Sequence, residues 1–342
     1  MYWLALVHGY SGEMPEALDA CTAALGLAEA AGNRPAALNA MCGIGSVLMA
    51  MGRLVEARQM IERGLAEFDM CNEAESLATR AAGRDVGVAG MAVLGWILWA
   101  LGYPDMAIAR VGAALQRAEA IGDPHSQAFA SYYASVLHAV RCEAAVAHTY
   151  AARCLTLSEE HGFGHWRNLS RTVRGICANR LDPSSDSLAT VGSELAEFVG
   201  SVYQFAITAL YVLLSQAFLA KHQLMPALEI ISKALASAEH NSERMFKAEF
   251  LRQKACALII EGGPGVSTGA QKLLEESLAV ARSQNARSLE LRTAADLARL
   301  YRGQGRHADA RDLLARIYDW FTEGFDTADL KEAKALLKEL DP

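Results

Sequence analysis

Residues 52–65 read GRLVEARQMIERGL and decide the fold, because their spacing recurs along the chain. Gly52 is followed after five positions by Ala57 and, eight positions later, by Leu65. The alanine, which we call the anchor, is alanine or serine in eight copies: Ala17, Ala57, Ala107, Ala147, Ser187, Ala227, Ala270 and Ala310. Successive anchors are 40, 50, 40, 40, 40, 43 and 40 residues apart. A period of this length is typical of a helical solenoid, in which each unit packs on its neighbours.

The repeat also fixes where small side chains occur, and this indicates how the helices of each unit pack. A small residue precedes each anchor by twelve positions, or by fifteen in the seventh copy: Ala5, Gly45, Gly95, Ser135, Gly175, Ser215, Ala255 and Ala298. A small side chain lets a neighbouring helix approach closely. The anchor and the apolar residues four and eight positions after it share one helix face. Each unit is therefore predicted to contain a helix A with the small residue and a helix B with the anchor. The turn between them holds the glycine, at a helix C-cap with positive φ.

This arrangement of small residues follows tetratricopeptide logic, although the usual tetratricopeptide period is about 34 residues. We predict an all-α, right-handed superhelical solenoid of about eight tetratricopeptide-like helix pairs over residues 1–342, with a capping helix at residues 326–340. HEAT-like stacking is the alternative. The longer interval after the second anchor predicts an irregular insert or extra helix at residues 69–84. The truncated first helix A, beginning at Met1, predicts that the chain starts inside a larger array.

Composition excludes several classes of function. The net charge of −7 disfavours a cationic face for nucleic acid. The seven cysteines have neither disulfide-like nor metal-like spacing, and no signal sequence precedes the repeats, so we expect a cytoplasmic protein. Two stretches, Val86–Pro104 and Phe198–Ala220, carry no charge. Each holds a small residue in register with the repeat, so we predict buried A helices and no membrane span.

No motif for chemistry is recognisable. The glycine-rich residues 263–269 lack the lysine and hydroxyl that a nucleotide loop needs. His161 and His165 flank a turn and have no third ligand nearby, so a metal site is not expected. We therefore predict no catalytic residue, no cofactor and no metal.

The concave face, lined by helix A, is the expected binding surface. It is predicted to pass from aromatic to cationic through Trp96, Trp99, Tyr132, Arg252, Arg292, Arg299 and Arg302. Such a groove fits a protein or peptide partner with an apolar anchor and an acidic segment. In the alternative interpretation the tryptophans are core residues between repeats and the arginines form a solvated terminal face. The oligomeric state is left open.

The C-terminal segment adds a resemblance. Residues 320–333 read WFTEGFDTADLKEA, and Ser288–Arg292 is followed by Leu297–Leu300. These segments resemble the last repeat of bacterial adenylate/guanylate cyclase proteins in which a class III cyclase domain precedes an AAA-type ATPase domain and a tetratricopeptide array. The resemblance covers about residues 50 to 340. The cyclase and ATPase motifs have no counterpart here, so the resemblance implies a non-catalytic interaction array for signal transduction. The alternative is the ligand-sensing solenoid of a LuxR-type ATP-dependent transcription regulator.

Overall fold

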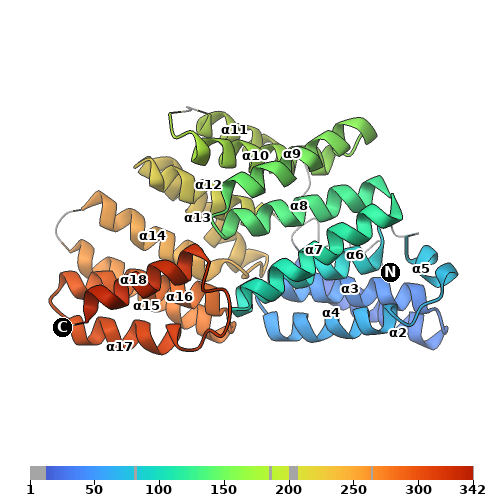
Figure 1. The fold of residues 1–342 in the computed structure, drawn as a ribbon, viewed down its shortest axis with the longest axis horizontal. Coiled ribbons are helices and arrows are strands. Elements are labelled where there is room, and N and C mark those ends of the chain that lie inside the picture. The colour runs from blue at the N-terminus through green and yellow to red at the C-terminus, as the bar shows by residue number, and fades with distance from the viewer. Residues whose placement is uncertain (1–12, 81–82, 185–186, 200–206, 263–264, 342) are drawn as a thin grey trace.

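The computed structural model describes residues 13–80, 83–184, 187–199, 207–262 and 265–341 (Figure 1). Within these ranges the chain is an all-α, tetratricopeptide-like solenoid without strands. The A helices of the second to eighth repeats are α3 (Arg34–Ala50), α6 (Val86–Leu101), α8 (Pro124–Val140), α10 (Gly164–Leu181), α12 (Ile207–Ala220), α14 (Lys247–Glu261) and α16 (Arg287–Gly303). The B helices, from the first repeat on, are α2 (Met14–Ala30), α4 (Leu54–Phe68), α7 (Pro104–Ile121), α9 (Ala144–His161), α11 (Leu188–Val199), α13 (Leu224–His240), α15 (Val266–Ser283) and α17 (His307–Tyr318). The first helix A, with Ala5, lies outside the described residues.

The small residues act as predicted. A Cβ atom added to the glycine twelve positions before the anchor would collide with the apolar side chain four positions after the anchor. The separation would be 2.4 Å from Ile61 at Gly45, 2.4 Å from Val111 at Gly95 and 2.5 Å from Val191 at Gly175. Three repeats therefore use the same close approach between helix A and helix B, and glycine provides the room.

The turns between helices A and B also match the prediction. Their glycines have positive φ, +77° at Gly52, +94° at Gly102 and +77° at Gly305. Two repeats place another residue there and keep the left-handed backbone, with φ of 65° at Cys142 and 56° at His222. This conformation costs a residue with a Cβ atom about 1–2 kcal/mol, so the turn geometry is imposed by the packing of the two helices.

Two elements stand outside the regular pairs. Helix α5 (Glu73–Thr79) lies within the long interval after the second repeat and packs on α3, where Asn39 Nδ2 donates to Thr79 O at 3.0 Å. Buried Asp85 then caps α6 and accepts from Arg117 Nε at 2.7 Å. Helix α18 (Ala328–Leu340) packs on α16 and α17 at the C-terminal end.

Two of the A helices, α6 and α12, are buried almost all round. In α6 every residue except Met91 is buried. In α12, eleven of fourteen residues are buried. The uncharged stretch Phe198–Ala220, which was predicted to be buried, also includes residues 200–206, and these lie outside the described ranges. No helix in the described ranges is both long and apolar enough to cross a membrane.

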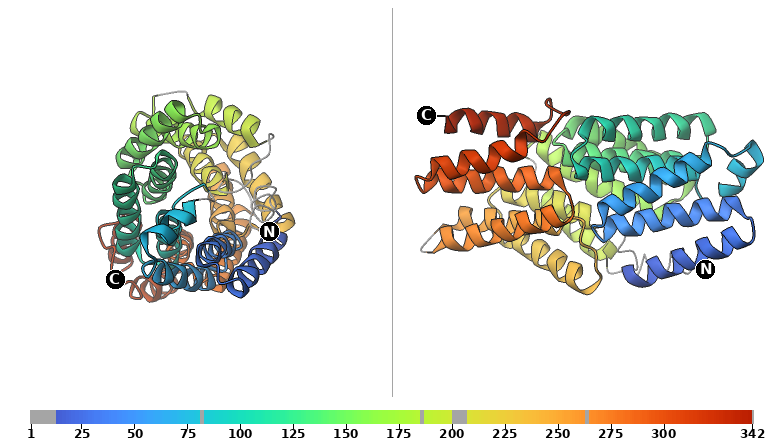
Figure 2. Two further views of the ribbon diagram at one scale, coloured as in Figure 1. Left: turned by 90° about the vertical axis from the view of Figure 1, so that its right-hand side faces the viewer. Right: turned by 90° about the horizontal axis from the view of Figure 1, so that it is seen from below.

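The solenoid curves until its C-terminal repeats touch its earlier ones, as the left view in Figure 2 shows. The backbone N–H groups of Arg244 and Met245 donate to Ala50 O at 2.8 and 3.0 Å. Ser288 Oγ donates to Trp99 O at 2.5 Å. We call the contacts of residues 244–246, 284–292 and 320–329 with the ends of α3, α6, α7 and α8 the closing interface. It joins repeats that are about five units apart in the sequence.

The segment that carries the family resemblance lies at this interface. Glu323 Oε1 accepts from the backbone N–H groups of Asp105 and Met106 at 3.0 and 3.1 Å, in the first turn of α7. In return, Gly324 N–H donates to Asp105 Oδ2 at 2.9 Å. The Trp320 ring meets Tyr103 edge-on, with centroids 5.6 Å apart. A side chain from the C-terminal loop thus caps a helix that begins more than 200 residues earlier in the sequence.

Candidate binding site

Three of the four predicted arginines meet in one cavity. The cavity has a volume of about 120 Å³ and lies between α14, α16 and α18. Its wall is formed by Cys142, Gln216, Arg252, Leu291, Arg292, Ala295, Asp296, Arg299, Ala328, Asp329 and Glu332. We call it the arginine pocket. Arg302 lies one helical turn beyond it and pairs with Glu339.

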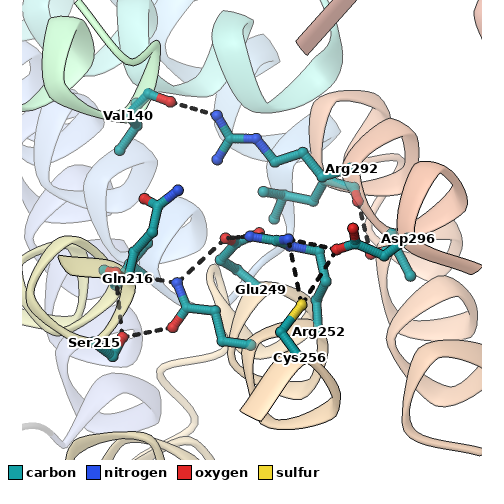
Figure 3. A network of polar contacts seen from close by, with 12 residues as sticks. Val140, Ser215, Gln216, Glu249, Arg252, Cys256, Arg292 and Asp296 are labelled. Carbon is teal, nitrogen blue, oxygen red and sulfur yellow. Dashed lines mark hydrogen bonds and ion pairs between the residues drawn. The ribbon is translucent and has the colours of Figure 1, made fainter. Parts of the chain in front are cut away.

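Arg252 is held by carboxylates on both sides (Figure 3). Its Nη2 and Nε atoms donate to the two oxygens of Glu249 at 2.6 and 3.0 Å, and its Nη1 atom donates to Asp296 Oδ2 at 2.6 Å. Burial acts to raise the pKa of Glu249, but the charge and hydrogen bonds of Arg252, with the charge of Arg292 nearby, hold it at about 2. Glu249 is therefore ionised at neutral pH, and the pair is part of the framework of the site.

Arg292 joins the pocket to the closing interface. Its Nε and Nη2 atoms contact Asp329 Oδ2 at 2.9 and 2.8 Å, and Nη2 also donates to Val140 O. Its guanidinium carbon lies 5.2 Å from the centroid of the Trp99 ring. The side chain is 6% exposed, so this arginine binds helices of its own chain and offers little surface to a partner.

Arg299 and Arg302 differ from the two buried arginines. Their side chains are 35% and 38% exposed, and each pairs with a carboxylate of α18 that is 59% exposed, Glu332 or Glu339. Arg299 also donates to Asp296 Oδ1 at 2.7 Å. Of the four predicted arginines, these two are the more exposed.

The arginine pocket is not cationic overall. The wall and the carboxylate behind it carry three guanidinium groups and four carboxylates: Arg252, Arg292, Arg299, Glu249, Asp296, Asp329 and Glu332. Burial, followed by the charge of Asp296, raises the pKa of Cys256 to about 12, so this thiol is protonated and is a poor nucleophile. Among the described residues, no group of three or more histidine, cysteine or carboxylate side chains is arranged to hold a metal ion.

The aromatic part of the predicted groove is closed. Trp96, Trp99 and Tyr132 are 4%, 3% and 0% exposed. Trp96 Nε1 donates to Tyr133 O at 2.9 Å, and the Trp99 ring packs 6.4 Å from that of Phe246. Here the prediction of an open aromatic surface is wrong. Neighbouring A helices cover these rings, as the alternative interpretation proposed, and the closing interface, which that interpretation did not include, also covers Trp99.

The carboxylates that pair with the arginines were not predicted from the sequence. Asp329, Glu332 and Glu339 lie on α18, and their spacing of three and seven residues places them on one helix face. Their partners Arg292, Arg299 and Arg302 are spaced by seven and then three residues on α16, so the intervals on the two helices do not coincide. The spacing of the charges alone therefore does not predict that α18 lies along α16.

One comparison with known proteins supports the repeat. Residues 1–66 match the tetratricopeptide repeat family. The match spans the first repeat and most of the second, and it favours the tetratricopeptide interpretation over HEAT-like stacking. No curated protein matches the chain.

Proposed function

We propose that this chain is a non-catalytic protein-interaction array that acts in signal transduction, like the arrays of the bacterial cyclase/ATPase proteins that it resembles. Tetratricopeptide repeats generally mediate contacts between proteins. Their stacked helices provide extended surfaces for proteins and peptides. The partner class is therefore a protein or peptide, and the proposed compartment is the cytoplasm. All seven cysteines are free thiols, which supports a reducing compartment.

The observation that carries the proposed binding mode is the exposed row of ion pairs between α16 and α18. A partner segment with carboxylates binds there by taking the places of Glu332 and Glu339 on Arg299 and Arg302. An exposed ion pair contributes only about 0–1 kcal/mol, so exchanging one carboxylate for another costs little. Arg252 and Arg292 stay paired within the chain during this exchange.

The test is charge reversal at the exposed arginines. A fluorescein-labelled peptide of alternating glutamate and alanine serves as the probe, and fluorescence anisotropy reports its binding. The Arg299→Glu/Arg302→Glu variant is expected to lose binding. A matched control, Arg306→Glu/Arg311→Glu, reverses two exposed charges at α17 that pair with Asp309 and Asp341. Equal affinity of the two variants for the peptide would refute the proposed surface.

A further inference from the structure

A second cavity lies apart from the arginine pocket, where α12, α13 and the loop into α14 meet. Its volume is about 260 Å³. The wall consists of Ile207, Thr208, Tyr211, Lys233, Ser237, Asn241 and Glu243, none of which lines the arginine pocket. This volume lies just below the range of about 300–1,000 Å³ that is typical of small-molecule sites, so only a small ligand fits. We call this space the Glu243 cavity.

The chemistry of the cavity centres on one buried carboxylate. Glu243 is 5% exposed, and its Oε1 atom accepts from Thr208 Oγ1 at 2.7 Å. In the part of the chain that the structure describes, Glu243 forms no ion pair with a lysine or arginine. A carboxylate has about four acceptor positions on its two oxygens. Glu243 therefore retains acceptor capacity, and the one ammonium group in the described wall, that of Lys233, pairs with Glu229 instead.

The electrostatics of the cavity agree with this geometry. Burial raises the pKa of Glu243 to about 7, and the hydrogen bond from Thr208 acts in the opposite direction. Burial, followed by the charge of Glu243, raises the pKa of Tyr211 as well. Lys233, also in the wall, is bound to Glu229 at 2.8 Å on the exposed side of α13. Above pH 7 Glu243 is mostly ionised, and a bound cation would then supply an opposite charge for it.

The other residues of the cavity wall indicate which class of ligand it fits. Ser237 and Asn241 provide polar groups, while Ile207 and the ring of Tyr211 provide an apolar side. An alkylammonium ion has three N–H donors at one end and an apolar stem at the other. The N–H donors match the polar side of the wall, and the stem matches its apolar side. A metal ion fits this wall less well, because it would need several carboxylates or carbonyls as ligands.

We propose that the Glu243 cavity binds a small primary alkylammonium ion, with the ammonium group on the Glu243 carboxylate and the stem against Ile207 and Tyr211. This site shares no residue with the proposed partner surface on α16 and α18. Its occupancy and the peptide binding described above can therefore be tested separately.

The test is titration calorimetry of the full chain at pH 8, where Glu243 is mostly ionised, with n-butylammonium chloride as the ligand and neutral 1-pentanol as the matched probe. Wild-type protein is expected to bind the cation saturably and the alcohol at least about tenfold more weakly. Glu243→Gln keeps an acceptor for Thr208 but removes the charge, and it is expected to weaken binding of the cation at least about tenfold. Glu239→Gln removes an exposed carboxylate of α13 outside the cavity wall and is expected to leave the affinity unchanged.

Several outcomes would overturn the proposal. They are the absence of saturable binding by wild-type protein, equal affinity of Glu243→Gln, or an equal loss of affinity in Glu239→Gln. If Glu243→Gln does not fold, Ser237→Leu provides an independent test, because it fills the cavity from α13 and leaves the carboxylate in place. Undiminished binding of n-butylammonium by this variant would also refute the site.

Discussion

Glu323 is expected to hold the closing interface together by capping α7 from a distant part of the chain. The N-cap residue of α7, Tyr103, has no side-chain cap of its own, and Glu323 accepts the N–H groups of Asp105 and Met106. Backbone N–H groups in the first turn of a helix have no hydrogen-bond acceptor within that helix. Glu323→Ala would leave both donors without this acceptor and remove a negative charge from the positive end of the helix dipole.

The expected loss follows from these two contributions. A side-chain cap contributes about 1 kcal/mol, and a charge at a helix terminus about 0.3–1 kcal/mol. We therefore expect Glu323→Ala to lower the free energy of unfolding by about 1–2 kcal/mol. Glu323→Gln keeps an acceptor oxygen and is expected to lose roughly half of that amount.

Amide hydrogen exchange provides a local measurement. Protection at Asp105 and Met106 is expected to fall about tenfold in Glu323→Ala, while the centre of α7 changes by no more than the global loss of stability. Asp326→Ala is the matched control, because it removes a fully exposed carboxylate from the same loop. Equal protection at the two amides and an equal free energy of unfolding in Glu323→Ala and in the control would refute this role of Glu323.

Three further predictions concern packing, turn geometry and pH. Gly95→Ala is expected to destabilise the protein by about 1–2 kcal/mol despite the better helix propensity of alanine, and Val111→Ala in the same chain should relieve part of this loss. A double-mutant cycle by urea denaturation measures the coupling, and strict additivity would contradict the close-approach explanation. His222→Gly should stabilise the protein by about 1 kcal/mol, because glycine adopts the left-handed turn without strain; an unchanged urea midpoint would speak against it. Glu243 has a folded-state pKa of about 7 against an ordinary value of 4.5, so the folded state keeps a proton that the unfolded chain releases, and this stabilisation is lost as the pH rises through 7. Relative to Glu243→Gln, wild-type protein is expected to lose roughly 3 kcal/mol between pH 4.5 and pH 8, and parallel pH profiles of the two proteins would argue against a buried, protonated Glu243.

The sequence by itself determined the repeating unit. Gly95 and Val111 are sixteen residues apart, and the turn at Gly102 lies between them, so the packing of one helix pair is specified within a short stretch. Such local contacts depend on side-chain size and backbone conformation, both of which can be read from residue types. For this reason the period, the close approach of the helices and the left-handed turns were all predictable.

Only the tertiary structure decided what happens to the concave face. Arg292 and Val140 are 152 residues apart, and Ser288 and Trp99 are 189 residues apart. Whether such residues meet depends on small rotations between successive repeats, which accumulate along the solenoid and leave no mark in any single repeat. That accumulated curvature buries Trp99 and places Arg292 in the closing interface, while Arg299 remains half-exposed on α16.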